Sequence, residues 1–214
     1  MAFNYSCFIS YRHGKYELIK RFVDDLKDAL SAELEPYFGQ MEIYIDSERL
    51  EPGHLYNKKL SAALCQSVCM IIVYTPQYFM EDKAYCTREF MAMEDLETRR
   101  ISLLEPEHQS NGLIIPIVLR GGNTVPPLIT GNRIFKSFEN FTLAEERLIQ
   151  NRNFIAAIGE IASYIHERYK HLRKVENTAC GGCDDFEIPE EETAVNWLKE
   201  HVEFLAPKFP FRNG

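Results

Sequence analysis

The chain has 214 residues, of which 45% are hydrophobic and 26% charged, and its formal net charge is −8. This composition is typical of a globular protein with one sizeable core and a small appendage. The acidic balance argues against a dedicated nucleic-acid binder. No apolar run is long enough for a signal peptide or a membrane span. We therefore expect a cytoplasmic protein that binds neither nucleic acid nor membrane.

The cysteines lie mostly within apolar segments. They are Cys7, Cys65, Cys69, Cys86, Cys180 and Cys183. Their placement predicts buried free thiols in a reducing cytoplasm rather than a disulfide framework.

Strands and helices alternate along most of the chain. Short apolar runs predict strands at 5–11, 41–45, 68–74 and 113–119, with a weaker strand near 133–138. Apolar residues at helical spacing predict helices at 16–34, 56–66 and 84–96, and a last helix from about 145 or 151 to 170. Pro36 and Gly39 are expected to close the first helix. Pro116 predicts a bulge or a missing bond in the fourth strand, because proline cannot donate to the ladder.

This alternation calls for an α/β fold with a parallel sheet covered by helices on both faces. Five strands in this rhythm predict the flavodoxin-like order 2-1-3-4-5, whose switch point lies between the first and third strands. A ligand should therefore meet the ends of strands 5–11 and 68–74, with Arg12 and Glu89 at the crevice. From spacing alone, Tyr85 and Glu89 share one helix face, and a solvated Glu89 beside a packed tyrosine is the simpler interpretation.

Three blocks of the sequence occur together and in order. They are Cys7–Arg12 (CFISYR), Tyr44–Gly53 (YIDSERLEPG) and Tyr85–Glu89 (YCTRE). The set resembles a TIR (Toll/interleukin-1 receptor) domain over about residues 4–170, and the third block is similar to the Trp-Cys-x-x-Glu block of NAD-cleaving members. This chain has Tyr85 where the family usually has tryptophan, so the aromatic surface is smaller.

The resemblance implies an NAD⁺ glycohydrolase of the stand-alone prokaryotic, antiphage immune-effector type, or a related cyclase. Glu89 aligns with the catalytic glutamate of the family and would stabilise an oxocarbenium-like state. The leaving nicotinamide is already cationic, so no strong general acid is needed. NAD⁺ is then the substrate, and we expect no cofactor and no metal.

The resemblance also implies which residues surround the substrate. They are Ser10, Tyr11, Arg12, Asp46 and Tyr85. Ser10 and Tyr11 would line the crevice floor, Arg12 could hold a phosphate, and Tyr85 could stack on the nicotinamide or the ribose. Two alternatives stay open: Arg12 paired with a surface acid, and Tyr11 in the core.

In the family, the BB loop packs on a neighbouring TIR domain and helps to complete the active site. Here that loop would contain Glu48, Leu50, Pro52 and Gly53. We expect self-association, head to tail, with an ordinary surface loop as the alternative. An activating partner protein or a nucleotide signal is an open possibility.

Residues 171–214 are predicted to form a C-terminal extension with an acidic linker and a short helix around 193–205, which packs on the domain or contacts a partner. A zinc site formed by His166, His171, Cys180 and Cys183 is an alternative to a Gly-Gly turn between unliganded thiols, which we favour.

Two other functions compete with the enzyme. A non-enzymatic TIR adaptor would act by assembly alone and would not need Glu89 behind an aromatic residue. A response-regulator receiver needs an acidic cluster after the first strand and an aspartate at the end of the third. This chain has Arg12-His13 and Thr75 at those positions, which argues against a receiver.

Overall fold

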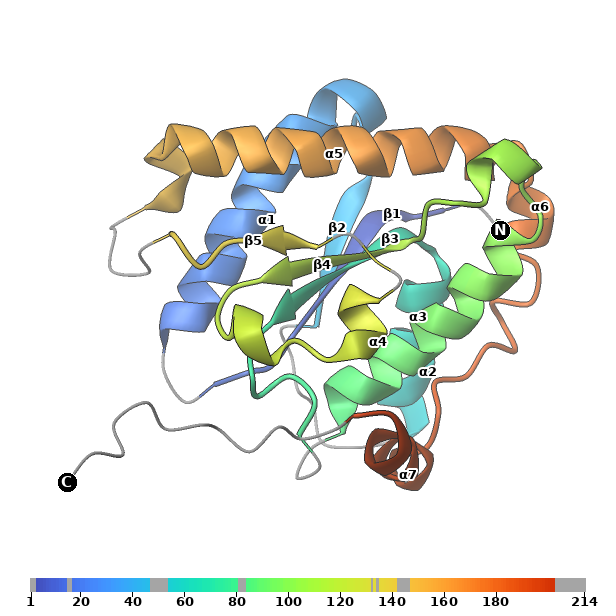
Figure 1. Ribbon diagram of the computed structural model, residues 1–214. Helices are drawn as coiled ribbons and strands as arrows, with labels where there is room; N and C mark the ends of the chain where they lie inside the picture. The colour runs from blue at the N-terminus through green and yellow to red at the C-terminus, as the bar shows by residue number, and fades with distance from the viewer. Residues whose placement is uncertain are drawn as a thin grey trace.

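The computed structural model describes residues 3–14, 17–46, 54–80, 84–131, 133, 135–141 and 147–202, and at 54–56 it describes the backbone alone. Its strands are β1 (Tyr5–Tyr11), β2 (Glu42–Ile45), β3 (Ser67–Tyr74), β4 (Ile114–Val118) and β5 (Lys136–Ser137). They form one parallel sheet in the order β2-β1-β3-β4-β5 (Figure 1). The predicted fold class and strand order are confirmed.

Helices cover both faces of this sheet. They are α1 (Glu17–Phe38), α2 (His54–Cys65), α3 (Tyr85–Ile101), α4 (Pro127–Thr130), α5 (Arg152–Arg173), α6 (Glu176–Ala179) and α7 (Glu191–His201), with 3-10 turns η2 (Pro106–His108), η3 (Gly122–Thr124) and η4 (Leu148–Gln150). Figure 1 shows α1 and α5 together on one face and α2 and α3 on the other. All eight residues of β3 are buried, as its continuous apolar run predicts. No helix in the part of the chain that the structure describes is long and apolar enough to cross a bilayer.

Two prolines lie inside regular elements. α1 runs through Pro36 to Phe38 and ends where Gly39 takes a φ of +64°, so the helix is longer than predicted. Pro116 pairs with Ile72 of β3 without a register shift, so the predicted bulge is not observed there. The Val118 carbonyl accepts from Phe138 on the β5 side, so Pro116, two residues earlier, faces the same side. β5 pairs with β4 only from Ile117 onward, so no ladder bond is lost at Pro116.

The expectation of six free thiols is wrong for one pair of cysteines. Cys65 and Cys183 form a disulfide with a Cα–Cα distance of 5.5 Å. The turn before Cys183, with Gly182 at a φ of +86°, returns the chain to the end of α2, where Cys65 lies. A pairing between residues 118 apart follows from this packing and has no local sequence signal. The other four cysteines are free and buried.

The disulfide also changes the interpretation of the proposed zinc ligands. Cys183 is bonded to Cys65, so it does not form a thiol pair with Cys180. The ring of His166 stacks on Tyr37, whereas that of His171 lies against His108. The two histidines therefore face different neighbours.

Candidate functional site

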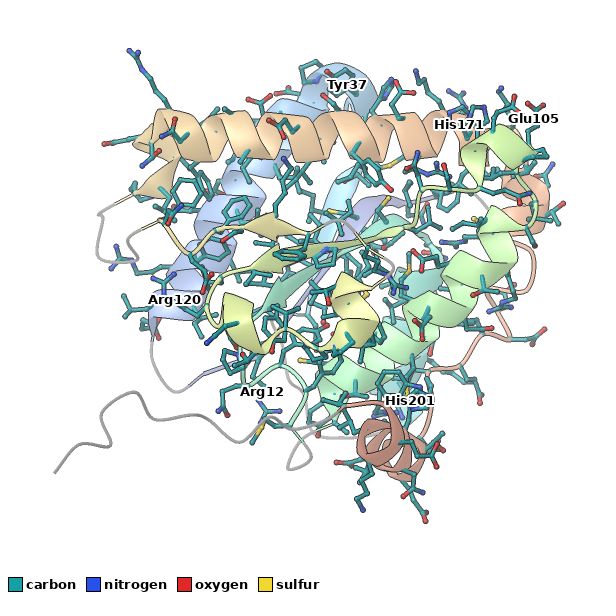
Figure 2. All side chains as sticks on the ribbon, in the orientation of Figure 1. Arg12, Tyr37, Glu105, Arg120, His171 and His201 are labelled. Carbon is teal, nitrogen blue, oxygen red and sulfur yellow. A yellow bond between two sulfur atoms is a disulfide. The ribbon has the colours of Figure 1, made fainter. Side chains whose placement is uncertain are left out.

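The carboxyl ends of β1 and β3 form the switch point of the sheet. The chain leaves β1 for α1 on one face and leaves β3 for α3 on the other. Ser10, near the end of β1, lies in register with Ile72 of β3. Arg12 follows at the same edge, where Figure 2 labels it. The structure thus provides the switch point that the strand order predicts, and we call this edge of the sheet, between the ends of β1 and β3, the crevice.

Three side chains from separate segments meet at this crevice. Ser10 comes from β1, Glu89 from the second turn of α3, and Tyr78 from the turn that follows β3. The Ser10 hydroxyl donates to Glu89 Oε2 at 2.5 Å, and its oxygen lies 2.6 Å from the Tyr78 hydroxyl. We call this arrangement the Ser10–Tyr78–Glu89 cluster.

The cluster is buried. Ser10 is 1% exposed, Tyr78 is 0% exposed and Glu89 is 5% exposed. Burial raises the pKa of Tyr78 well above its ordinary value, and the nearby Cys86 and Glu89 raise it further. Tyr78 therefore keeps its proton and donates to Ser10, which donates to Glu89. A carboxylate held in this way, away from bulk water, acts strongly on a positive charge placed beside it.

Packing on both sides of Glu89 fixes the second turn of α3. Arg88 is 6% exposed, and its Nε donates to the Pro189 carbonyl at 2.5 Å. Phe90 is fully buried, with its ring 5.5 Å from that of Phe79 in an edge-to-face arrangement. The contacts of Arg88 and Phe90 therefore restrict the motion of the α3 turn that carries Glu89.

The other predicted substrate residues lie near the same edge. Tyr11 is 9% exposed and stacks on His13 with ring centroids 4.3 Å apart. Arg12 and Tyr85 are half-buried, and Tyr85 lies one turn before Glu89 on α3. Asp46, also half-buried, follows β2, whose Ile45 pairs with Ile9 of β1. These residues thus lie at or just after the carboxyl ends of β1 and β2, or begin α3, at the same edge of the sheet as Ser10 and Glu89.

The predicted assembly residues lie outside the described part of the chain. They are Glu48, Leu50, Pro52 and Gly53. Residues 81–83, just before α3, also lie outside it. A cavity of about 450 Å³ between α1 and β2, lined among others by Lys27, Glu35 and Met41, has none of the candidate site residues in its wall. The candidate site is therefore the Ser10–Tyr78–Glu89 cluster and not this cavity, because the carboxylate and the hydroxyls lie in the cluster.

Sequence analysis missed two polar groups near the crevice. Tyr78 is brought back under β3 by a turn in which its backbone nitrogen donates to the Thr75 carbonyl at 2.8 Å. The Thr75-Pro76 turn directly after the central strand is the signal that could have indicated it. Thr75 is 7% exposed, and its hydroxyl has no hydrogen-bond partner within the described residues.

Comparisons with known proteins give the family. A search of curated proteins finds no match. Among solved structures, the chain is similar to the TIR domains of the activated Roq1 resistosome, a structure in which Roq1 recognises the pathogen effector XopQ. That similarity has 17% identity and a TM-score of 0.34, and covers 91% of this chain and 96% of the other. The family model for the TIR domain matches residues 7–149, which include β2 to β5, most of β1 and the whole Ser10–Tyr78–Glu89 cluster. The chain therefore belongs to the TIR domain family.

Proposed function

We propose that this TIR domain is an NAD⁺ glycohydrolase in which Glu89 is the catalytic carboxylate. The observation that supports this most directly is the burial of Glu89 at the switch point, with Ser10 holding one carboxylate oxygen at 2.5 Å. A buried glutamate tied to a buried serine and tyrosine has no evident use in a domain that acts by surface assembly alone.

The cluster suits the cleavage of the nicotinamide–ribose bond. As that bond breaks, its electron pair goes to the nicotinamide nitrogen, and positive charge develops on the ribose. Glu89 stabilises this charge in a medium of low dielectric constant, and water then adds to the ribose carbon and releases a proton. Tyr78 and Ser10 keep the carboxylate in position, so it does not have to reorganise as the charge appears.

We assign supporting roles to the residues at the mouth of the crevice. In this proposal Arg12 pairs with a phosphate of NAD⁺, and Tyr85 stacks on the nicotinamide or ribose. Asp46, Tyr11 and the Thr75 hydroxyl are the remaining polar groups offered to the substrate. Activity is expected to need self-association through the loop with Glu48, Leu50, Pro52 and Gly53, in a cytoplasmic defence against phage.

The test compares Glu89→Gln with Glu94→Gln, the same substitution on the same helix. Glu94 is 39% exposed and lies outside the cluster. Purified proteins are incubated with NAD⁺, with and without a crowding agent that drives assembly, and nicotinamide is measured by chromatography. Glu89→Gln should lower the rate by about 10²-fold or more, the effect expected of an electrostatic stabiliser. Glu94→Gln should retain the rate of the unaltered chain.

Two alternatives have distinct outcomes. A cyclase would release nicotinamide in the same Glu89-dependent way and form a cyclic ADP-ribose isomer, so the second product separates it from the hydrolase. An adaptor would form the same assemblies with and without Glu89 and release no nicotinamide, even in a cell extract that supplies an activating partner or nucleotide signal. Equal rates for Glu89→Gln and the unaltered chain would contradict our assignment of the catalytic residue.

A further inference from the structure

Residues 176–202, which belong to the C-terminal extension predicted at 171–214, contact the rest of the fold at several points. The disulfide joins Cys183 to Cys65 at the end of α2. The Glu176 carboxylate accepts a bond from the Phe3 nitrogen at 2.8 Å. The Ile188 nitrogen donates to the Ser61 hydroxyl at 3.0 Å. The extension is therefore part of the packed structure.

The extension contacts the two segments that carry the site. The Pro189 carbonyl accepts from Arg88, the residue before Glu89. The Trp197 ring lies 5.7 Å from the ring of Phe90, the residue after Glu89, and 6.4 Å from that of Phe79, the residue after Tyr78. Figure 1 shows α7 beside the end of α3 where that helix begins. Contacts from the extension thus hold the immediate neighbours of both Glu89 and Tyr78.

A cavity of about 200 Å³ reaches Cys65, the more deeply buried of the two disulfide cysteines, which are 2% and 4% exposed. Its wall includes Cys65, Arg99, Arg100, Gly181 and Gly182. The two glycines have no side chains to fill this space. Arg100 is 1% exposed, and its guanidinium donates to the carbonyls of Cys65 and Ala179 on the two sides of the disulfide. The Arg99 side chain lines the same cavity and is 53% exposed, and its Nη2 pairs at 2.7 Å with the exposed carboxylate of Asp95. This positive wall suits a small thiol that carries carboxylates.

We propose that Cys65–Cys183 is a thiol-exchange site for a low-molecular-weight anionic thiol, and that its opening loosens the turn that carries Glu89. A thiolate attacks Cys65 Sγ, the disulfide bond breaks, and its electron pair leaves on Cys183 Sγ, which takes up a proton. A second thiol then attacks the mixed disulfide and frees Cys65. The two thiols are oxidised to their own disulfide, and the protein disulfide is reduced to two thiols.

Opening removes the covalent connection between the extension and α2. The contacts that remain are a few hydrogen bonds and the rings around Trp197, which we expect to open more often once the chain is free to move away. Arg88 then loses its carbonyl partner, and Phe90 loses one side of its packing. The effect on catalysis rests on the proposed function, whereas the effect on α3 does not.

The first test is hydrogen exchange on the whole chain, oxidised and after reduction with glutathione. Amides of 22–30 in α1 report the global loss of stability on reduction, and exchange at 86–92 and 191–201 should speed up at least about tenfold more than theirs. Cys180→Ser, which leaves the disulfide cysteines intact, should behave like the unaltered chain in both states. Unchanged exchange at 86–92, whether or not α7 loosens, would overturn the proposal.

The second test addresses the chemical class of the thiol. Arg99→Gln removes one exposed positive charge at the cavity. It should slow reduction by glutathione about twofold to fivefold relative to reduction by neutral β-mercaptoethanol, an electrostatic effect that added salt diminishes. The ratio of the rates of reduction by glutathione and by β-mercaptoethanol isolates the effect of the Arg99 charge. If the substitution merely loosened the extension, reduction by both thiols would become faster. An unchanged ratio would overturn the assignment of an anionic thiol.

The third test measures nicotinamide release in both redox states. If Glu89 catalyses the reaction, reduction should lower kcat about tenfold and leave KM within about twofold, because the carboxylate moves while the crevice mouth is retained. A kcat that is insensitive to reduction, despite faster exchange at 86–92, would overturn the coupling to catalysis. Absence of nicotinamide release in either state would count against the proposed function, and the exchange experiment alone would then decide the proposal.

Discussion

Hydrogen bonds in the Ser10–Tyr78–Glu89 cluster should be energetically coupled. Ser10→Ala removes the bond to Glu89 and also leaves the fully buried Tyr78 hydroxyl without its partner. A bond to a charged group contributes about 1.5–3 kcal/mol, and an unsatisfied buried hydroxyl costs about 1–3 kcal/mol. We expect Ser10→Ala to lower the free energy of unfolding by about 2–4 kcal/mol. Tyr78→Phe alone should cost about 1 kcal/mol.

The double variant removes the stranded hydroxyl together with its partner. Its loss of stability should therefore be smaller than the sum of the two single losses by about 1–2 kcal/mol. Urea unfolding followed by the fluorescence of Trp197 measures all four free energies. Tyr164→Phe is the matched control, because the Tyr164 hydroxyl donates to the Gly112 carbonyl and shares no partner with Ser10. Additive losses within about 0.5 kcal/mol for Ser10→Ala and Tyr78→Phe would refute the reasoning.

Three further predictions concern stability. Glu97 Oε2 pairs with the largely buried Arg133 at 2.5 Å, so Glu97→Gln should lower the free energy of unfolding by about 2–4 kcal/mol in urea titrations. Burial raises the pKa of the Cys69 thiol from 9.0 to about 12. This raised pKa stabilises the fold below pH 9, and the stabilisation is lost as pH rises toward 12. In Cys69→Ala, the free energy of unfolding should therefore fall less steeply with pH across this window, by about 1.4 kcal/mol per pH unit. An unchanged slope would contradict this prediction. Reduction of Cys65–Cys183, which are 118 residues apart, should cost about 4 kcal/mol and lower the Tm by roughly 8–16 °C, checked by calorimetry with and without reductant.

Local patterns predicted most of the fold because the relevant forces act locally along this chain. The continuous apolar run of β3 requires burial on both faces of the strand, and the helical spacing of α3 requires burial of one face of the helix. The alternation of elements then leaves few arrangements of a parallel sheet. The end of α1 was misplaced because Pro36 lies in the last turns, where losing one backbone bond does not stop the helix. Gly39 is the residue that ends it.

The site was predictable only in part. The strand order, which sets the ends of β1 and β3 side by side, predicts the position of Arg12 and Glu89, whereas Ser10 and a catalytic role for Glu89 are implied only by the resemblance to TIR domains. Tyr78 was missed because its role depends on how one turn folds back beneath β3. The disulfide was missed because Cys65 and Cys183 meet through the path of the extension, and periodicity carries no information about such a distant pairing.

The bond between Phe3 and Glu176 has a consequence for synthesis of the chain. These residues are 173 positions apart, and β1, which begins two residues after Phe3, lies inside the sheet with partners on both sides. A ribosome therefore releases the first strand well before its last neighbours exist. During synthesis, the apolar strands β1 and β3 are therefore incompletely covered until the later elements emerge. Chaperones can bind the largest apolar surface of the nascent chain in this period. A chain that stops near residue 149 would contain all five strands but lack α5, so the face of β1 and β3 that α5 covers would remain exposed.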